Sequence, residues 1–252
     1  MSGALAVIGL GPGEARHRTA EAEAALAHAT RLYGYESYLG RIAARPGQEK
    51  IASDNGEEIA RARAALADAA LGHQVALVSG GDPGVFAMAA AVCEAIEHGP
   101  PEWRAVDLVI VPGVTAMLAA AAAAGAPLGH DFCAISLSDN LKPWPLIEKR
   151  LAAAAEAGFV IALYNPVSRA RPWQLDAALT RLRALLPASV PVIFARAVGR
   201  ADERVAVTRL AAADPRAADM ATLVIIGSAE TRVIERADRS PLVYSPRSAG
   251  GA

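Results

Sequence analysis

Short continuous apolar runs alternate with alanine-rich stretches along most of the chain. Such runs are typical of strands that are covered on both faces, and the longer stretches are typical of helices packed against them. In the first half we predict strands at 5–8, 31–35, 75–78 and 106–111, and helices at 19–29, 57–70, 85–96 and 115–124. This alternation predicts a parallel sheet.

The second half follows a related but less regular pattern. Strands are predicted at 132–137, 160–164 and 192–195, separated by helices at 145–157 and 173–186. Three further strands, at 204–209, 222–226 and 232–234, have short links, which favour antiparallel pairing. We therefore predict an α/β protein with an N-terminal domain at 1–113, a mixed C-terminal domain at 114–245 and a loose tail at 246–252.

Composition narrows the class of protein. A length of 252 residues suits one large domain or two small ones. Apolar residues make up 53% of the chain but aromatic residues only 5%, so the core is expected to consist of Ala, Val, Leu and Ile. Because 25 basic and 26 acidic residues nearly cancel, no overall charge favours nucleic acid or a membrane surface as a partner.

Neither a metal site nor export is expected. Cys93 and Cys133 lie in apolar stretches without metal-ligand spacing, which predicts two buried, reduced thiols. Residues 11–13 (GPG) interrupt the first apolar run, so no signal peptide is predicted. The longest apolar run, 119–124 with its flanks, is too short to cross a bilayer. We expect a cytoplasmic protein.

Four predicted strands end in loops rich in glycine, proline or polar residues. They are residues 9–14 (GLGPGE), 79–86 (SGGDPGVF), 111–116 (VPGVTA) and 163–168 (LYNPVS). Ligands of α/β proteins bind outside the carboxyl ends of strands, so the recurrence predicts one shared cleft. The alternatives are a plain turn for the first loop and helix capping for Asp82 and Thr115.

The first three of these motifs together resemble the tetrapyrrole methylase family, and the resemblance covers nearly the whole chain. Residues 136–144 (SLSDNLKPW), 147–150 (IEKR) and 161–168 (IALYNPVS) narrow it to the ring-contracting branch of the cobalamin pathway. The resemblance implies a class III methyltransferase fold, in which a cofactor cleft separates two α/β domains. It also implies a homodimer, a tetrapyrrole (precorrin) substrate, and S-adenosyl-L-methionine as a cofactor that leaves as S-adenosyl-L-homocysteine.

The family's cofactor contacts can be carried over by position to both predicted domains. In the first domain they fall on Pro12, Gly80, Gly81, Asp82, Phe86, Thr115 and Ala116. In the second they fall on Leu163, Tyr164, Asn165, Ala195, Arg196, Ala197, Thr222 and Leu223. The last five rest on strand order more than on motif identity.

Methyl transfer mainly requires that the enzyme align the methyl donor with the acceptor carbon. It needs no nucleophilic side chain, because a sulfonium methyl donor is already activated. Ring contraction also needs proton transfers, for which polar side chains are required. The candidates are His130, Asp131, Ser138, Asp139 and Lys142. A loop histidine and a helix-capping aspartate are the structural alternatives for His130 and Asp139.

The substrate's many carboxylates favour basic partners. Candidates are Arg16, His17, Arg18, Lys142, Arg169 and Arg171, with a solvated charged surface as the alternative for each cluster. The sequence leaves open whether the tetrapyrrole is metal-free or cobalt-bound.

Two other classes of protein stay open at this point. A nicotinamide-dependent oxidoreductase would use the first glycine-rich loop together with an acidic residue near Glu36. A non-catalytic tetrapyrrole carrier would explain the basic clusters but not the glycine-rich loops. Binding of S-adenosyl-L-homocysteine would separate the methyltransferase from both.

Overall fold

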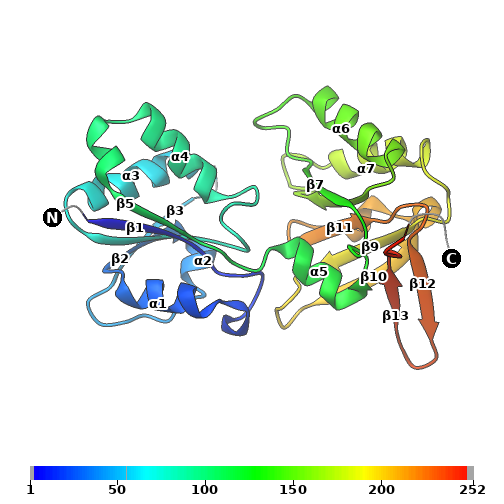
Figure 1. Ribbon diagram of the computed structural model, residues 1–252, viewed down its shortest axis with the longest axis horizontal. Helices are drawn as coiled ribbons and strands as arrows, with labels where there is room; N and C mark the ends of the chain where they lie inside the picture. Colours follow the sequence, from blue (N-terminus) through cyan, green and yellow to red (C-terminus); the bar gives the residue numbers. More distant parts are fainter. Residues whose placement is uncertain (1–2, 55, 249–252) are drawn as a thin grey trace. The chain divides into compact units, whose positions relative to one another are not determined.

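The computed structural model describes residues 3–54 and 56–248. The chain divides into two compact units, Met1–Ala116 (unit 1) and Met117–Ala252 (unit 2). Each unit has its own five-stranded sheet, and most of the helices and strands are labelled in Figure 1.

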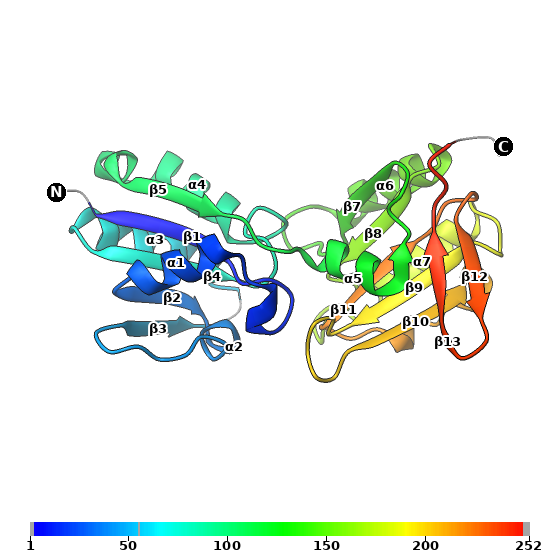
Figure 2. The same cartoon turned by 60° about the horizontal axis from the view of Figure 1, so that its bottom comes forward.

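Unit 1 is built on a five-stranded sheet in the order β3-β2-β4-β1-β5, as Figure 2 shows. Every neighbouring pair is parallel, which confirms the parallel sheet predicted for the first half. The strands are β1 (Ala4–Gly9), β2 (Arg31–Tyr35), β3 (Glu49–Ser53), β4 (Gln74–Ser79) and β5 (Asp107–Val111). Strand β3 was not predicted, because it carries charged residues and is mostly exposed.

Helices cover both faces of this sheet. They are α1 (Ala20–His28), α2 (Glu36–Leu39), α3 (Glu58–Ala70) and α4 (Met88–His98), with short 3-10 helices η1 (Ala15–His17) and η2 (Pro101–Ala105). Alternate residues of β1 face opposite sides: Leu5 and Val7 pack in one core cluster with Leu66 and Val92 of α3 and α4. Ile8 packs in the other, with Leu26 of α1.

Two expectations about burial are wrong. The apolar strand β5 was expected to be covered on both faces, but Val109 and Ile110 are 43% and 40% exposed. It is an edge strand, so only its neighbour β1 borders it within the sheet. Cys93 is an exposed free thiol on α4, and Cys133 in unit 2 is half-buried, so neither is the fully buried thiol that was expected.

Unit 2 contains a mixed five-stranded sheet in the order β10-β9-β11-β8-β7. Its strands are β7 (Phe132–Ser136), β8 (Val160–Tyr164), β9 (Pro191–Arg196), β10 (Arg204–Arg209) and β11 (Thr222–Ile226). Strands β7 and β8 are parallel, whereas β11 is antiparallel to β8 and β9, and β10 is antiparallel to β9. The predicted mixed sheet is thus confirmed.

A smaller three-stranded sheet completes unit 2. It joins β12 (Arg232–Arg236), β13 (Arg239–Tyr244) and the short β6 (Gly125–Ala126). The helices are α5 (Ala116–Ala124), α6 (Trp144–Glu156) and α7 (Gln174–Arg183), with η3 (Leu210–Ala212) and η4 (Pro215–Ala217). Side chains from α6, α7 and the larger sheet form one core cluster, which includes Leu151, Leu163, Leu179 and Val224.

The chain is anchored up to the border of the expected tail. Ser245 is buried, and its hydroxyl donates a 2.7 Å hydrogen bond to the carbonyl of Pro127. Of the tail predicted at 246–252, residues 249–252 lie outside the described residues. Among the described residues, no helix has the length and apolar character to cross a bilayer.

Candidate functional site

The strand order of unit 1 brings its three glycine-rich loops together. Strands β4, β1 and β5 are neighbours in the sheet and run in the same direction. The loops that follow them therefore leave the same edge of the sheet side by side, as Figures 1 and 2 show. The fourth loop singled out in the sequence follows β8 and belongs to unit 2.

The first and second loops are joined backbone to backbone. The amide of Gly11 donates to the carbonyl of Gly81 at 3.1 Å, and the amide of Gly81 donates to the carbonyl of Gly11 at 3.0 Å. Both residues have a positive φ, of 69° and 68°, a conformation that glycine adopts without the cost borne by other residues. The glycines thus serve the contact between the two loops.

Asp82 joins the second loop to the third. One carboxylate oxygen accepts a 2.8 Å hydrogen bond from the amide of Gly84, and the other accepts a 3.0 Å bond from the amide of Gly113. The helix-capping interpretation of Asp82 is wrong, because α4 begins only at Met88 and its N-cap is Ala87. The charge of Asp82 is thereby fixed at the carboxyl edge of the sheet.

Two further glycines let the three loops touch. A Cβ atom on Gly9 would lie 2.7 Å from the carbonyl oxygen of Gly81 and from the amide nitrogen of Gly113. A Cβ atom on Gly113 would lie 2.3 Å from the same oxygen of Gly81. Since these neighbours are backbone atoms, no side-chain movement could relieve the overlap.

Positive φ angles mark the candidate loops in both units. Among the described residues, three residues other than glycine have a positive φ: Phe86 (52°), Asn165 (51°) and Ala197 (50°). Each was predicted to contact the cofactor. Such backbone conformations cost on the order of 1–3 kcal/mol and cluster at ligand sites. Of these three residues, Phe86 has the large apolar side chain, and that side chain is half-exposed.

The remaining predicted residues of unit 1 lie in the same loops. Pro12 is half-buried between Gly11 and Gly13, Gly80 precedes Gly81, Thr115 is buried, and Ala116 begins α5. All of them lie within the loops that leave the carboxyl edge of the sheet.

Sequence reasoning missed Tyr38 at this edge. A Cβ atom on Gly80 would lie 2.9 Å from two ring atoms of Tyr38, so the ring lies directly against the backbone of the second loop. The ring also makes an edge-to-face contact with Tyr35, with centroids 5.6 Å apart. The sequence did contain a signal that could have pointed to Tyr38, because three of the chain's five tyrosines fall within residues 33–38.

The predicted cofactor residues of unit 2 also come together at one end of a sheet. Strand β11 runs antiparallel to β8 and β9, so its first residues lie beside their last ones. Thr222 pairs with Arg196, Leu223 with Ala195, and Val224 with Leu163. The structure therefore groups all eight predicted positions, Leu163, Tyr164, Asn165, Ala195, Arg196, Ala197, Thr222 and Leu223, at this end.

Hydrogen bonds hold several of these residues in place. The side-chain amide of Asn165 donates to the hydroxyl of Ser136 at 3.0 Å, and the hydroxyl of Tyr164 accepts a 3.0 Å bond from the amide of Met117 in the first turn of α5. Arg196 forms 2.7 Å ion pairs with both Asp202 and Asp219. Hydrogen bonds to these two carboxylates raise the pKa of Arg196 and occupy its guanidinium within the protein.

Three catalytic candidates lie at the same end of the unit 2 sheet. Ser138, Asp139 and Lys142 follow β7, which is parallel to its neighbour β8. Asp139 accepts a 3.2 Å hydrogen bond from the side-chain amide of Gln174, a buried residue that sequence reasoning missed. Asp139 does not cap α6, whose N-cap is Pro143. Burial and the charge of Arg150 lower the pKa of Lys142.

His130 and Asp131 lie at the other end of that sheet. They precede β7, and the carbonyl of Asp131 accepts a hydrogen bond from the first amide of β8, that of Val160. The imidazole Nδ1 of His130 accepts a 2.8 Å bond from the amide of Asp131. Because a five-residue strand spans about 16 Å, the structure does not bring His130 to Ser138 and Asp139.

The predicted substrate-binding residues differ in how they are engaged. Arg16 is exposed and forms a 3.6 Å ion pair with Glu14, whereas the neighbouring His17 is half-buried. The side chain of Arg18 is only 7% exposed and bonds Glu23 at 2.9 Å and the carbonyl of Arg41. The structure thus gives Arg18 partners within unit 1 that sequence reasoning did not foresee.

The other basic candidates belong to unit 2. Arg169 is exposed, and Arg171 is half-buried in a tight turn closed by two 3.0 Å backbone bonds to Ser168. Lys142, also a catalytic candidate, is half-buried. Among the described residues, no group of three or more His, Cys, Asp or Glu side chains is placed to hold a metal ion.

The strand order argues against a nicotinamide-dependent oxidoreductase. Glu36 does follow the end of β2, as that hypothesis requires. In the dinucleotide-binding fold, however, the strand that carries the acidic residue lies beside the first strand. Here β4 separates β2 from β1, so the strand that leads to Glu36 is not the neighbour of the strand that leads to the first glycine-rich loop.

Comparison with known families decides the class of protein. Residues 4–214 match the model of the Tetrapyrrole (Corrin/Porphyrin) Methylases. The chain belongs to the tetrapyrrole methylase family. The resemblance carried by the glycine-rich loops is thereby confirmed, and so is the fold class, the tetrapyrrole methylase (class III methyltransferase) fold.

Close relatives of this tetrapyrrole methylase share its full length. The precorrin-3B C(17)-methyltransferase of Sinorhizobium sp is 65% identical over 252 residues, which are 100% of this chain and 99% of that protein. The probable cobalt-factor III C(17)-methyltransferase of Salmonella typhimurium is 42% identical, over 96% of this chain and 98% of that one. The crystal structure of the methyltransferase CobJ is 50% identical and superimposes with a TM-score of 0.92, covering 97% of this chain and 100% of that one.

Proposed function

We propose that this chain methylates precorrin-3B at C17, with S-adenosyl-L-methionine as the methyl donor, and contracts the ring to give precorrin-4 in cobalamin biosynthesis. The observation that carries the proposal is the 65% identity, from end to end, with a protein named for this reaction. In the transfer, the bond between the methyl carbon and sulfur breaks, a bond between that carbon and C17 forms, and S-adenosyl-L-homocysteine leaves.

The glycine-rich loops of unit 1 suit this cofactor. When bound, S-adenosyl-L-methionine supplies a methyl group that its positive sulfonium has already activated. The loops offer closely packed backbone and, in Asp82, a carboxylate whose two oxygens are held by the amides of Gly84 and Gly113. Each carboxylate oxygen keeps further lone pairs, so Asp82 can still attract a cationic ligand. Gly80, Gly81 and Thr115 would line the remaining part of the contact.

The polar residues that follow β7 are the proposed proton-transfer groups. Asp139 is held by the amide of the buried Gln174, and Ser138 lies next to it. Lys142 has a lowered pKa, so it releases its proton more readily than an ordinary lysine. These residues are proposed to move protons during ring contraction. The assignment of cofactor contacts to unit 2 stays a prediction.

Basic side chains are proposed to hold the acetate and propionate groups of the substrate. Arg16 and Arg169 are exposed, and Arg171 and Lys142 are half-buried. Guanidinium groups bind carboxylates through paired hydrogen bonds, so several of them would orient a polycarboxylate macrocycle. His17 remains a weaker candidate, and Arg18 is less suited because Glu23 and the carbonyl of Arg41 already engage it.

A cobalt-bound substrate is the second candidate. The Salmonella relative that is named for cobalt-factor III shares 42% of its residues with this chain, whereas the relative named for precorrin-3B shares 65%. We therefore favour the metal-free substrate. A homodimer and a cytoplasmic location complete the proposal, and light scattering of the purified protein tests the dimer.

The deciding experiment offers the enzyme each tetrapyrrole with methyl-labelled S-adenosyl-L-methionine. We expect one labelled methyl group to enter precorrin-3B, in a ring-contracted product identified by mass spectrometry and NMR. Transfer to cobalt-factor III alone would make the second candidate correct. If neither accepts a methyl group although S-adenosyl-L-homocysteine binds, the substrate is wrong. If calorimetry shows no binding of that ligand, the cofactor is wrong as well.

A further inference from the structure

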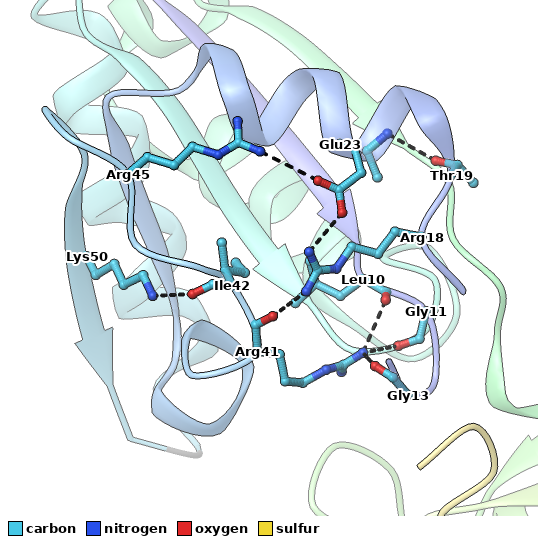
Figure 3. A network of polar contacts seen from close by, with 11 residues as sticks. Leu10, Gly11, Gly13, Arg18, Thr19, Glu23, Arg41, Ile42, Arg45 and Lys50 are labelled. Atoms are coloured by element: carbon cyan, nitrogen blue, oxygen red, sulfur yellow. Dashed lines mark hydrogen bonds and ion pairs between the residues drawn. The ribbon is translucent and has the colours of Figure 1, made fainter. Parts of the chain in front are cut away.

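Arg41 reaches from the turn after α2 to the first glycine-rich loop, as Figure 3 shows. One of its guanidinium nitrogens, Nη2, donates to the carbonyl oxygens of Leu10 at 3.1 Å and Gly11 at 2.9 Å. The same nitrogen also donates to the carbonyl of Gly13. Three carbonyl groups of a four-residue segment therefore converge on one cationic group.

This convergence has an electrostatic reason. Carbonyl oxygens carry partial negative charge and repel one another when they point at the same place, so a cation among them lowers the free energy of that arrangement. A peptide group is planar, and its N–H points opposite to its C=O. Fixing the carbonyls of Leu10 and Gly13 on Arg41 therefore directs the amides of Gly11 and Glu14 away from it.

The effect extends from the first loop to the second. The carbonyl of Gly11, which accepts from Arg41, also accepts from the amide of Gly81, and the amide of Gly11 donates to the carbonyl of Gly81. Gly81 is followed directly by Asp82, which binds the third loop through the amide of Gly113. Arg41 thus acts on the first loop, which is bonded directly to the second and, through Asp82, is linked to the third.

Arg41 is itself fixed in position. Its carbonyl accepts a hydrogen bond from Arg18, which is paired with Glu23 at 2.9 Å. The ammonium group of Lys50 donates to the carbonyls of Leu39 at 3.0 Å and Ile42 at 2.5 Å, on either side of Arg41. Figure 3 shows the bonds from Arg18 to Glu23 and Arg41, and the bond from Lys50 to Ile42, near the base of the loop. The turn that carries Arg41 is therefore held by two cations of the same unit.

We propose that Arg41 is a positioning residue that sets the shape of the first glycine-rich loop for cofactor binding. It acts through the carbonyls of Leu10, Gly11 and Gly13 and does not take part in the chemistry. The proposal rests on the proposed function, because it assumes that this loop receives S-adenosyl-L-methionine. It predicts that loss of Arg41 weakens cofactor binding while turnover at saturating cofactor is maintained.

The test compares two Arg41 variants of the full chain with the wild type. Arg41→Gln removes the cation, and we expect the dissociation constant of S-adenosyl-L-homocysteine to rise by about tenfold or more, because hydrogen bonds from a charged group are lost. The KM for the cofactor should rise with it, while kcat changes little. Arg41→Lys keeps the charge as a single point without the planar guanidinium, so an intermediate effect is expected.

Arg45→Gln is the matched control. Arg45 is the neighbouring arginine that pairs with Glu23 at 3.7 Å but bonds none of the loop carbonyls, so its loss should leave cofactor affinity unchanged. If Arg41→Gln does not fold, Arg41→Lys takes its place in the test. In addition, ethylguanidinium supplies the missing guanidinium group and should restore affinity to a folded Arg41→Ala variant.

The outcomes separate this inference from the proposed function. Wild-type affinity in folded Arg41→Gln or Arg41→Lys protein would overturn the role of Arg41. A lower melting temperature with unchanged affinity would make Arg41 a purely structural residue and would overturn it too. Failure of the wild-type protein to bind S-adenosyl-L-homocysteine would instead overturn the proposed function.

Discussion

The two ends of the parallel sheet in unit 1 satisfy their polar groups in different ways. At the amino end, side chains pair with one another: Asp68 accepts a 2.6 Å bond from Arg31 and a 2.5 Å bond from Tyr33, and Arg31 also pairs with Glu49 at 3.5 Å. At the carboxyl end, backbone amides and carbonyls of the glycine-rich loops bond each other, with the carboxylate of Asp82 among them.

This difference indicates that the polar interactions at the two ends of the sheet serve different purposes. The amino end is a closed group of charges, in which burial opposes ionisation but hydrogen bonds from Tyr33 and Arg31 lower the pKa of Asp68. The carboxyl end instead holds strained backbone at Phe86 and close loop contacts that only glycine permits. We interpret the first as a device for stability and the second as one for binding, and four predictions test that division.

The largest effect is expected from Gly113→Ala. The new methyl group would lie 2.3 Å from the carbonyl oxygen of Gly81, so the second and third loops must separate. We expect binding of S-adenosyl-L-homocysteine to be lost and the free energy of unfolding to fall by about 1–3 kcal/mol, as for an overpacked site. Calorimetry and denaturant unfolding measure both. Gly40→Ala is the control, since its methyl group would lie at an ordinary 3.5 Å from the nearest atom, the carbonyl oxygen of Glu36.

The next largest effect is expected from Asp82→Asn. Asparagine replaces one of the two carboxylate oxygens with an NH₂ donor, so one of the bonds from Gly84 and Gly113 is lost in the present geometry, and the negative charge is lost as well. Because hydrogen bonds to charged groups contribute about 1.5–3 kcal/mol, affinity for the cofactor should fall by about tenfold or more. Asp107→Asn removes a carboxylate from the opposite end of the same sheet and should leave affinity unchanged. Equal affinities in the two variants would remove Asp82 from the binding site.

A smaller effect, and the opposite pattern, is expected from Asp68→Asn. Removing the charge weakens the bonds to Arg31 and Tyr33, so the free energy of unfolding should fall by about 1–3 kcal/mol. Cofactor affinity should stay at the wild-type value, because Asp68 lies at the amino end. A variant that loses affinity without losing stability would contradict the division between the two ends.

The smallest effect concerns pH. The pKa of Asp68 is lowered in the folded state, so its contribution to stability is present above the ordinary carboxyl pKa and is lost as pH falls through the folded value. The difference in melting temperature between wild type and Asp68→Asn should therefore be constant above about pH 5. It should shrink toward zero as the pH falls below about 4. A difference that grows on acidification would show that this carboxylate is not stabilised by its partners.

Strands with a continuous apolar or alternating run were predictable from the sequence, and two strands that begin with exposed polar residues were not. Strands β8, β10 and β11 begin and end where their apolar or alternating runs do. By contrast the edge strand β3 and β13, the central strand of the small sheet, were missed, because each begins with exposed polar or charged residues. The order of the strands was also beyond the sequence, since nothing local to β4 indicates that it lies between β1 and β2.

The candidate site could be located from the sequence, but its internal bonds could not. The glycine-rich loops and the family resemblance identified the region, whereas the alternative that Asp82 caps a helix is wrong, because residues 82–84 form a turn before α4. Tyr38 and Arg41 were missed because they come from the connection after β2, which has no glycine motif. Their roles depend on strands β2 and β4 being neighbours in space.

The position of β1 has a consequence for the time course of synthesis. Strand β1 pairs only with β4 and β5, and its first partner in the register, Gln74, is made about 70 residues after Ala4. At about 5–20 residues per second, the apolar strand that leads into the first glycine-rich loop waits roughly 4–14 seconds for that partner. The part of unit 1 that is translated first is thus completed only after β4 and β5 have emerged, and during that interval the growing chain carries an unpaired apolar strand near its amino terminus.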